Sequence, residues 1–186
     1  MSAGSTSSRF WIPRWVLERS WLVLRQDGLK GVESTVTWGG IRFGGDAVIM
    51  SLIYPCGRDV ELHPGLISVG PDTTAEMGRW LRGHGQAGLI QVHSHPGAWT
   101  GHSATDSDFS VASSEGFVSL VWPDFARRPV DQPTDFGVHR LRGGRWTELK
   151  GTEVTALLRF VESEALIWAK APEPDHDEMG TGRRSR

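Results

Sequence analysis

Two short apolar runs constrain the fold of this chain more than any other feature of its sequence. They are AVIMSLIYP at residues 47–55 and GLIQVHSHPG at residues 88–97. Each run is typical of a strand that stops at a proline. The first is a continuous apolar run and predicts burial on both faces, and the second predicts a buried strand. A sheet that is buried on both faces needs helices packed against it.

Further strands and helices are predicted around these two runs. Residues 35–38 are β-branched or aromatic and residues 117–123 are mostly apolar, which indicates two more strands. Two alternating runs predict a hairpin over residues 136–150. Asp72 or Thr73 is expected to cap a helix. Helical spacing or capping signals predict helices over residues 15–24, 72–81, 103–116 and 152–168. The sequence therefore predicts an α/β (α+β) fold, with a mixed β-sheet flanked by helices.

Length and composition indicate one soluble domain. The 186 residues are 38% hydrophobic and 23% charged, and the domain is placed at residues 10–170, between polar segments 1–9 and 171–186 that are expected to be disordered. The formal net charge of −2 argues against nucleic acid or an anionic membrane as a partner. The single cysteine, Cys56, excludes an internal disulfide, and neither a signal sequence nor a membrane-length apolar run is present. A cytoplasmic location is therefore expected.

The segment HSHPGAWTGHSATD, residues 93–106, carries a set of metal-binding side chains. His93 and His95 are two residues apart at the end of a predicted strand, so both imidazoles can face one atom. Pro96 ends the strand, and Asp106 lies on the first turn of the next predicted helix, where it can add a carboxylate oxygen. Two imidazoles and one carboxylate suit Zn²⁺, and three protein ligands leave a fourth position to water, as in catalytic sites.

The spacing of these residues resembles the motif of the JAB/MPN family of metallopeptidases, also called JAMM. That motif is an upstream Glu, then H-[S/T]-H-P, six residues, and S-x-x-D. This chain has H-S-H-P at residues 93–96 and S-A-T-D at residues 103–106, so every position of the contiguous motif matches. The resemblance extends over roughly residues 14–122. It implies a JAB/MPN-like fold and zinc-dependent hydrolysis of an amide or isopeptide bond.

Four glutamates upstream of the motif are candidates for the general base, which takes a proton from water. Glu18 and Glu76 lie in predicted helices, where they are expected to face solvent, and Glu61 in a predicted loop is the alternative choice. Glu33 directly precedes the strand at residue 35. Bacterial members of the resembled family often have E-G-x-V-x-W-x-G there, and this chain has E-S-T-V-T-W-G-G, with Ser34 in place of Gly. The resemblance therefore implies that Glu33 is the base.

The serines and other histidines near the motif have separate expectations. Ser103 can cap the predicted helix, and the resemblance implies that its hydroxyl also donates to the oxyanion of the scissile carbonyl. Ser94 is expected to face the opposite side of the strand from the two ligands. His102 is not expected to be a ligand. The remaining histidines are expected to be exposed to solvent: His63, His84, His139 and His176.

The resemblance also suggests a substrate. Family members with this motif remove ubiquitin or ubiquitin-like proteins from lysines, and stand-alone bacterial members process such proteins, in some cases within antiphage conjugation systems. A ubiquitin-like protein or its conjugates, together with E1-like and E2-like enzymes, are thus the expected partners. Trp99 and residues 56–70, which are expected to form a loop with one short strand, are the candidate contacts to the tail of that substrate. Two alternatives remain open: a general metallopeptidase, and a non-catalytic MPN-type scaffold that binds other proteins.

Overall fold

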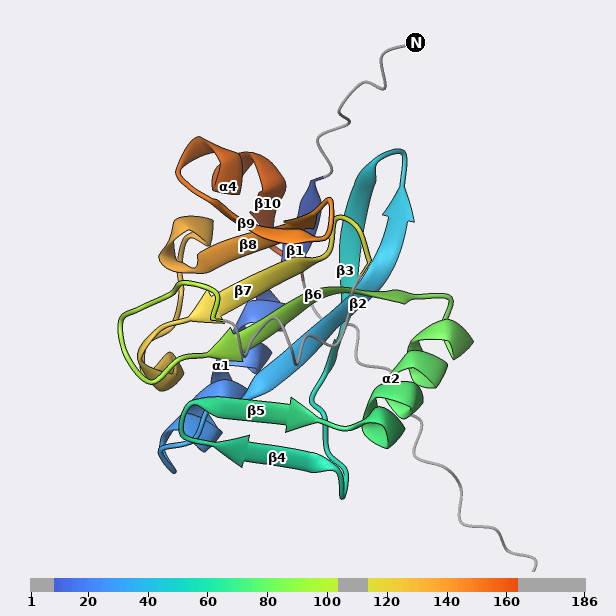
Figure 1. Cartoon of the computed structure of the whole chain (residues 1–186). Coiled ribbons are helices and arrows are strands. Elements are labelled where there is room, and N and C mark those ends of the chain that lie inside the picture. The colour runs from blue at the N-terminus through green and yellow to red at the C-terminus, as the bar shows by residue number, and fades with distance from the viewer. Residues whose placement is uncertain (1–8, 104–113, 164–186) are drawn as a thin grey trace, which may run out of the picture.

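The computed structural model describes residues 9–103 and 114–163, which form one mixed β-sheet with helices packed against it (Figure 1). The sheet has eight strands in the order β10-β1-β3-β2-β6-β7-β8-β9, and β4 and β5 form a separate hairpin. The strands are β1 (Phe10–Pro13), β2 (Thr35–Phe43), β3 (Asp46–Ile53), β4 (Val60–His63), β5 (Leu66–Val69), β6 (Ala87–Ser94), β7 (Val118–Trp122), β8 (Gly137–Arg142), β9 (Arg145–Leu149) and β10 (Leu158–Val161). The helices are α1 (Arg14–Gly28), α2 (Pro71–Gly83), α4 (Thr152–Leu157) and the short 3₁₀ helices η1 (Asp124–Ala126) and η2 (Pro133–Asp135). The predicted class, a mixed sheet flanked by helices, is confirmed.

The two longer helices, α1 and α2, cover opposite faces of the sheet. Trp38 on β2 points toward α1, because its indole N–H donates to Ser20 Oγ at 2.8 Å. The next residue, Gly39, lies so close to α2 that an added Cβ would come within 2.4 Å of Leu81 Cδ2. Since successive residues of a strand face opposite sides, α1 and α2 lie on different faces.

The main hydrophobic core lies between α1 and the sheet. Apolar side chains of α1 pack there against β1, the central strands β2, β6 and β7, and the edge strand β10. Burial of apolar area is the dominant favourable term in folding, so this cluster fixes the position of the central strands. Its members include Val16, Leu24, Phe10, Ile12, Val36, Trp38, Ile90, Val92, Leu120 and Leu158.

The C-terminal helix is shorter than its apolar spacing predicts. The prediction of a helix over residues 152–168 is wrong at residues 158–163, because α4 ends at Leu157, and residues 164–168 lie outside the described part of the chain. Residues 158–161 instead form β10, which pairs in parallel with β1 and sets Leu158 opposite Phe10. Both side chains are buried in the core, and this long-range pairing overrides the local helical pattern.

Residues 56–70 and the start of α2 also differ from the prediction. The segment contains two paired strands, β4 and β5, rather than a loop with one strand. Helix α2 begins at Pro71, so neither Asp72 nor Thr73 is its cap. The Asp59 carboxylate accepts the backbone N–H groups of Asp72 and Thr73 at 3.0 and 3.2 Å. A hydrogen bond from the Thr73 hydroxyl is the main cause that holds the pKa of Asp59 below its ordinary value.

The hairpin predicted over residues 136–150 is confirmed as β8 and β9, joined by Gly143 and Gly144, which both have positive φ. In the described part of the chain, no helix is long and apolar enough to cross a membrane. The helix predicted over residues 103–116 lies almost wholly outside the described residues. The predicted polar termini lie outside them too, apart from Arg9, which forms an ion pair with Asp46.

Candidate metal centre

His93 and His95 lie at the C-terminal end of β6, in the middle of the sheet (Figure 1). Strand β6 is paired along both edges, antiparallel to β2 and parallel to β7, which fixes its end in space. The two side chains are only 3% and 5% exposed, and their Nε2 atoms are 3.2 Å apart. The structure therefore brings together the two imidazoles that the strand alternation places on one face.

The separation of these nitrogens fits two ligands of one zinc ion. Zinc–nitrogen bonds are about 2.0–2.1 Å long, so atoms 3.2 Å apart subtend an angle of about 100° at the metal, close to tetrahedral. Within residues 9–103 and 114–163, no group of three or more His, Cys, Asp or Glu is placed to hold a metal ion. Asp106, the predicted third ligand, lies outside these residues, so its role stays a prediction.

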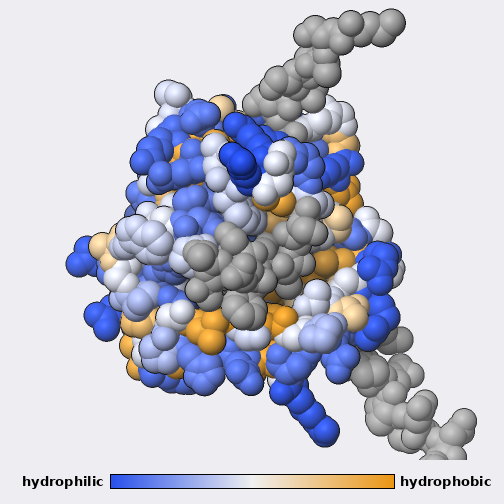
Figure 2. All heavy atoms as spheres, in the orientation of Figure 1, coloured by the Kyte–Doolittle hydropathy of each residue, from blue (hydrophilic) through white to orange (hydrophobic). Residues whose placement is uncertain are grey.

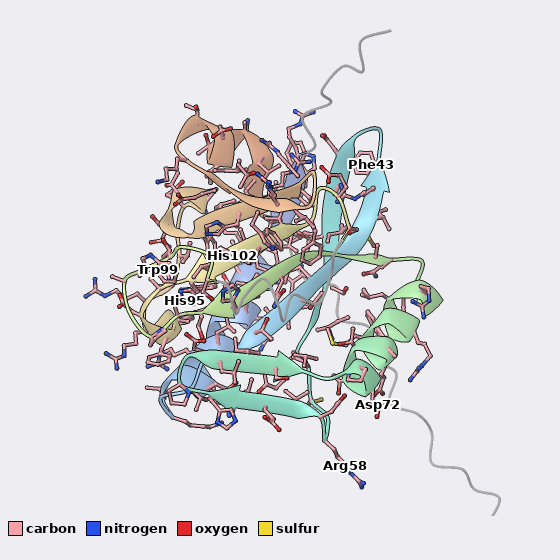
Figure 3. All side chains as sticks on the ribbon, viewed as in Figure 1. Phe43, Arg58, Asp72, His95, Trp99 and His102 are labelled. Carbon is pink, nitrogen blue, oxygen red and sulfur yellow. The ribbon has the colours of Figure 1, made fainter. Side chains whose placement is uncertain are left out.

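The backbone orients His95 for ligation through Nε2. Its Nδ1 atom lies 3.0 Å from the carbonyl oxygen of Trp99, and a carbonyl can only accept, so Nδ1 carries the hydrogen. That bond leaves the Nε2 lone pair of the neutral ring available to a metal, as in most protein sites in which histidine binds zinc. The Trp99 ring also stacks on His95, with ring centroids 5.2 Å apart and an interplanar angle of 16°. Figure 3 shows His95, Trp99 and His102 gathered at this end of β6, away from Phe43 and Arg58.

Glu33 lies beside the two histidines through the pairing of β2 with β6. Thr35 is opposite His93 in the antiparallel register, and the backbone N–H of Ser94 donates to the carbonyl of Ser34 at 3.0 Å. Continuing this register sets Glu33 opposite His95, on the face that the two imidazoles share. Glu33 is 6% exposed.

The alternative base, Glu61, lies in a different environment. It is on β4, its side chain is 68% exposed, and its carboxylate is 3.7 Å from His63 Nε2. A carboxylate on an open strand face has water as its main neighbour, whereas a general base must reach the reacting atoms. Of the two glutamates, the geometry favours Glu33.

Ser34 and Ser94 face the side of the sheet that α1 covers. The backbone N–H of Ser34 donates to Ser94 Oγ at 3.1 Å, and the hydroxyl of Ser34 donates to Asp27 Oδ2 at 2.8 Å. Ser94 is fully buried and lies between the two predicted ligands without sharing their face. The placement expected for Ser94, opposite the ligands, agrees with this geometry.

The segment that follows His95 is anchored to β8 by a histidine whose predicted exposure to solvent is wrong. His139 was expected to be exposed, but it is 3% exposed, and its Nε2–H donates to the carbonyl of Thr100 at 2.9 Å. Thr100 also lies against Gly137, where an added Cβ would come within 2.0 Å of the Thr100 carbonyl oxygen. A period-two reading could have placed His139 correctly, because it shares a strand face with the buried Leu141.

His102 and Ser103 complete the described part of this segment. The His102 ring stacks on Trp146 of β9, with centroids 4.5 Å apart, and meets the ring of His139 at 5.2 Å. The ring thus packs against β8 and β9, and the expectation that His102 is not a ligand stays a prediction. Ser103 is half-buried and is the last described residue before the gap, so its predicted contact with an oxyanion remains a prediction.

Comparison of the sequence with known proteins shows the family to which the chain belongs. The probable metalloprotease y4jG of Sinorhizobium fredii (strain NBRC 101917 / NGR234) is 32% identical over 137 residues, which are 73% of this chain and 83% of that protein. The chain therefore belongs to the metalloprotease family of this relative. No protein-family model matches the chain.

A solved structure supports the fold. The solution structure of protein DSY2949 from Desulfitobacterium hafniense matches with a TM-score of 0.60 at 18% identity. The match covers 83% of this chain and 94% of that one. At this level of identity the likeness concerns the fold alone.

Proposed function

We propose that this metalloprotease is a zinc-dependent isopeptidase of the JAB/MPN (JAMM) type, which cuts after the C-terminal tail of a ubiquitin-like protein. The observation that carries the proposal is the 3.2 Å separation of His93 Nε2 and His95 Nε2, on the strand face shared with Glu33. The metalloprotease relative supports hydrolysis of a peptide bond. The contiguous motif H-S-H-P, six residues, S-A-T-D supports the finer assignment.

The residues divide the chemistry between them. His93, His95 and Asp106 would hold the metal ion. When bound, zinc would polarise the scissile carbonyl and lower the pKa of a water molecule to near 7. Glu33 would take the proton of that water on its carboxylate and later deliver it to the leaving amine. Ser103 would donate its hydroxyl hydrogen to the oxyanion.

The surroundings of the histidines suit an extended chain as substrate. The Trp99 side chain is 62% exposed although its ring stacks on His95, so it offers a flat apolar surface beside the ligands. On the other side, the backbone N–H of Glu33 donates to the carbonyl of His63 at 3.2 Å, which joins the β4–β5 hairpin to the base. Figure 2 shows hydrophobic patches among hydrophilic residues on the same face. A tail that contains glycine would approach such a site closely, since glycine has no Cβ.

A general metallopeptidase is the second candidate. The name of the relative specifies only a probable metalloprotease and no class of substrate. A non-catalytic scaffold is disfavoured, because such a domain has no need for two buried histidines 3.2 Å apart beside a buried glutamate.

The test is cleavage of a panel of fusions, analysed by mass spectrometry. Each fusion joins a ubiquitin-like domain, ending in a glycine-containing tail, to a second protein, and unrelated unfolded peptides serve as the comparison. The proposal predicts a cut directly after the tail, which phenanthroline abolishes. Equal cutting of the unrelated peptides would favour the general metallopeptidase. No cutting of any fusion by zinc-loaded protein would favour the scaffold.

A further inference from the structure

A buried carboxylate lies at the end of α1, on the face of the sheet opposite the metal centre. Asp27 is 5% exposed, and three donors converge on it. The Ser34 hydroxyl donates to Oδ2 at 2.8 Å, the Tyr54 hydroxyl donates to the same oxygen at 2.9 Å, and Lys30 Nζ donates to Oδ1 at 2.9 Å. A buried charge with so many partners is stabilised in one position.

The protonation states fix the direction of these hydrogen bonds. Burial raises the pKa of Asp27, but hydrogen bonds from Lys30, Ser34 and Tyr54 outweigh it and hold the pKa below its ordinary value. Burial, and then the bond to Asp27, raise the pKa of Tyr54 to about 12. Near neutral pH the carboxylate is therefore charged and accepts from both hydroxyls.

Ser34 connects this carboxylate to the metal centre. Its hydroxyl reaches Asp27, while its backbone N–H and carbonyl are both bonded to Ser94, at 3.1 and 3.0 Å. Ser94 is the residue between the two histidines, and Glu33 directly precedes Ser34. The backbone carbonyl of Asp27 also accepts from the N–H groups of Lys30 and Val32 at 2.8 and 3.4 Å, which closes the turn that leads to Glu33.

We propose that Asp27, acting through the Ser34 hydroxyl, is the positioning residue that fixes the Glu33 carboxylate against the metal centre. The inference rests on the proposed function, in which Glu33 is the general base. Asp27 touches no reacting atom, because it lies on the face that α1 covers. Asp27 acts by holding the backbone between the end of α1 and Ser34, the segment that carries Glu33. Ser34, which stands where the resembled family often has Gly, provides the hydroxyl that links the Glu33 segment to Asp27.

The size of the effect follows from the demands on a general base. Misplacement of a catalytic group by about 1 Å can cost on the order of 10²-fold in rate. Loss of the Ser34–Asp27 bond frees only one anchor of the Glu33 segment, since the backbone bonds of Ser34 to Ser94 remain. We therefore expect Ser34→Ala to lower kcat about 10- to 100-fold, with little change in KM and full zinc content.

Tyr54→Phe is the matched control, because it removes a second hydroxyl from the same carboxylate oxygen. It leaves the bond between Ser34 and Asp27 intact, so kcat should stay within about threefold of wild type while the melting temperature falls as much as in Ser34→Ala. Asp27→Asn is the conservative rescue. Its amide oxygen can accept both hydroxyls while Lys30, whose side chain is 62% exposed, turns to solvent. Asp27→Ala, which removes the acceptor, should lower kcat as Ser34→Ala does.

The experiment measures kcat, KM, zinc content and melting temperature for these variants, together with amide hydrogen exchange over residues 31–35 in the metal-free protein. Faster exchange in Ser34→Ala than in Tyr54→Phe, with the kcat loss confined to Ser34→Ala and Asp27→Ala, supports the inference. Equal kcat in Ser34→Ala and Tyr54→Phe would overturn it. A separate Glu33→Ala variant distinguishes failure of the proposed function from failure of the positioning role. Full activity in Glu33→Ala would refute the proposed base, whereas an inactive Glu33→Ala beside a fully active Ser34→Ala would refute only the positioning role.

Discussion

Replacement of Gly28 by alanine should disturb the contact that joins α1, through η1, to the candidate metal centre. Gly28 is the last residue of α1, and an added Cβ would come within 2.3 Å of the Phe125 carbonyl oxygen and 2.6 Å of Phe125 Cβ. Phe125 has little freedom to retreat, since its backbone is already in the left-handed region at φ 53° and ψ 34°. The Phe125 N–H donates to the carbonyl of His95 at 2.7 Å, so a shift of η1 should displace His95, a predicted metal ligand.

The magnitude follows from these distances. An ordinary contact needs 3.4 Å or more, so the backbone must move by about 1 Å. Overpacking of this kind lowers the free energy of unfolding by about 1–3 kcal/mol, and replacement of a helical Gly by Ala raises it by about 0.5–1 kcal/mol. The net loss in the free energy of unfolding should be about 1–2 kcal/mol, or a fall in melting temperature of roughly 2–8 °C for a chain of this length.

The assay is thermal and urea unfolding of Gly28→Ala beside Gly83→Ala. Gly83 is the last residue of α2, and an added Cβ there meets no atom within 4 Å, so this control should be as stable as wild type or slightly more stable. Zinc retention against a chelator should weaken in Gly28→Ala alone. Wild-type stability and wild-type zinc retention in Gly28→Ala would show that the close contact with Phe125 does not constrain the site.

Three further predictions concern other parts of the site. His139→Phe keeps a ring but removes the donor to the Thr100 carbonyl, so urea unfolding should show a loss of about 1–3 kcal/mol, and an unchanged value would contradict the anchoring role. Trp99→Ala keeps the carbonyl that binds His95, so elemental analysis should find zinc content unchanged while the cleavage rate falls; loss of zinc would contradict this division of roles. The pKa of Asp27 is lowered in the folded protein, so its stabilising contribution is complete above its unfolded pKa of about 3.9 and is lost as the pH falls through the folded value. Asp27→Asn should therefore show a shallower loss of stability than wild type below about pH 4, and identical acid-unfolding curves would refute this.

The elements that the sequence predicts well are those whose signal is local. The run at residues 88–97 begins with apolar residues and stops at Pro96, and its first seven residues belong to β6, which is largely buried and paired on both edges. Alternation along that strand is enough to place His93 and His95 on one face. That Glu33 directly precedes β2 also follows from local pattern, whereas its place opposite His95 depends on the long-range pairing of β2 with β6.

The features that the sequence does not predict depend on long-range contacts. Strand β10 exists because Leu158 pairs with Phe10, 148 positions earlier in the chain, and neither segment alone has a distinctive strand pattern. The cap of α2 comes from Asp59, which is remote from the helix start along the chain. Asp27 gives no signal in sequence either, since an acidic residue near the end of a helix is usually exposed.

Zinc content of the purified protein tests the central claim most directly. Elemental analysis should find about one zinc per chain in wild type and in Glu33→Ala, because Glu33 is not a ligand. The His93→Ala, His95→Ala double variant should lose the metal, while the control His84→Ala, which changes an exposed histidine at the C-terminal end of α2, should keep it. Full zinc in the double variant, or none in wild type, would contradict the account.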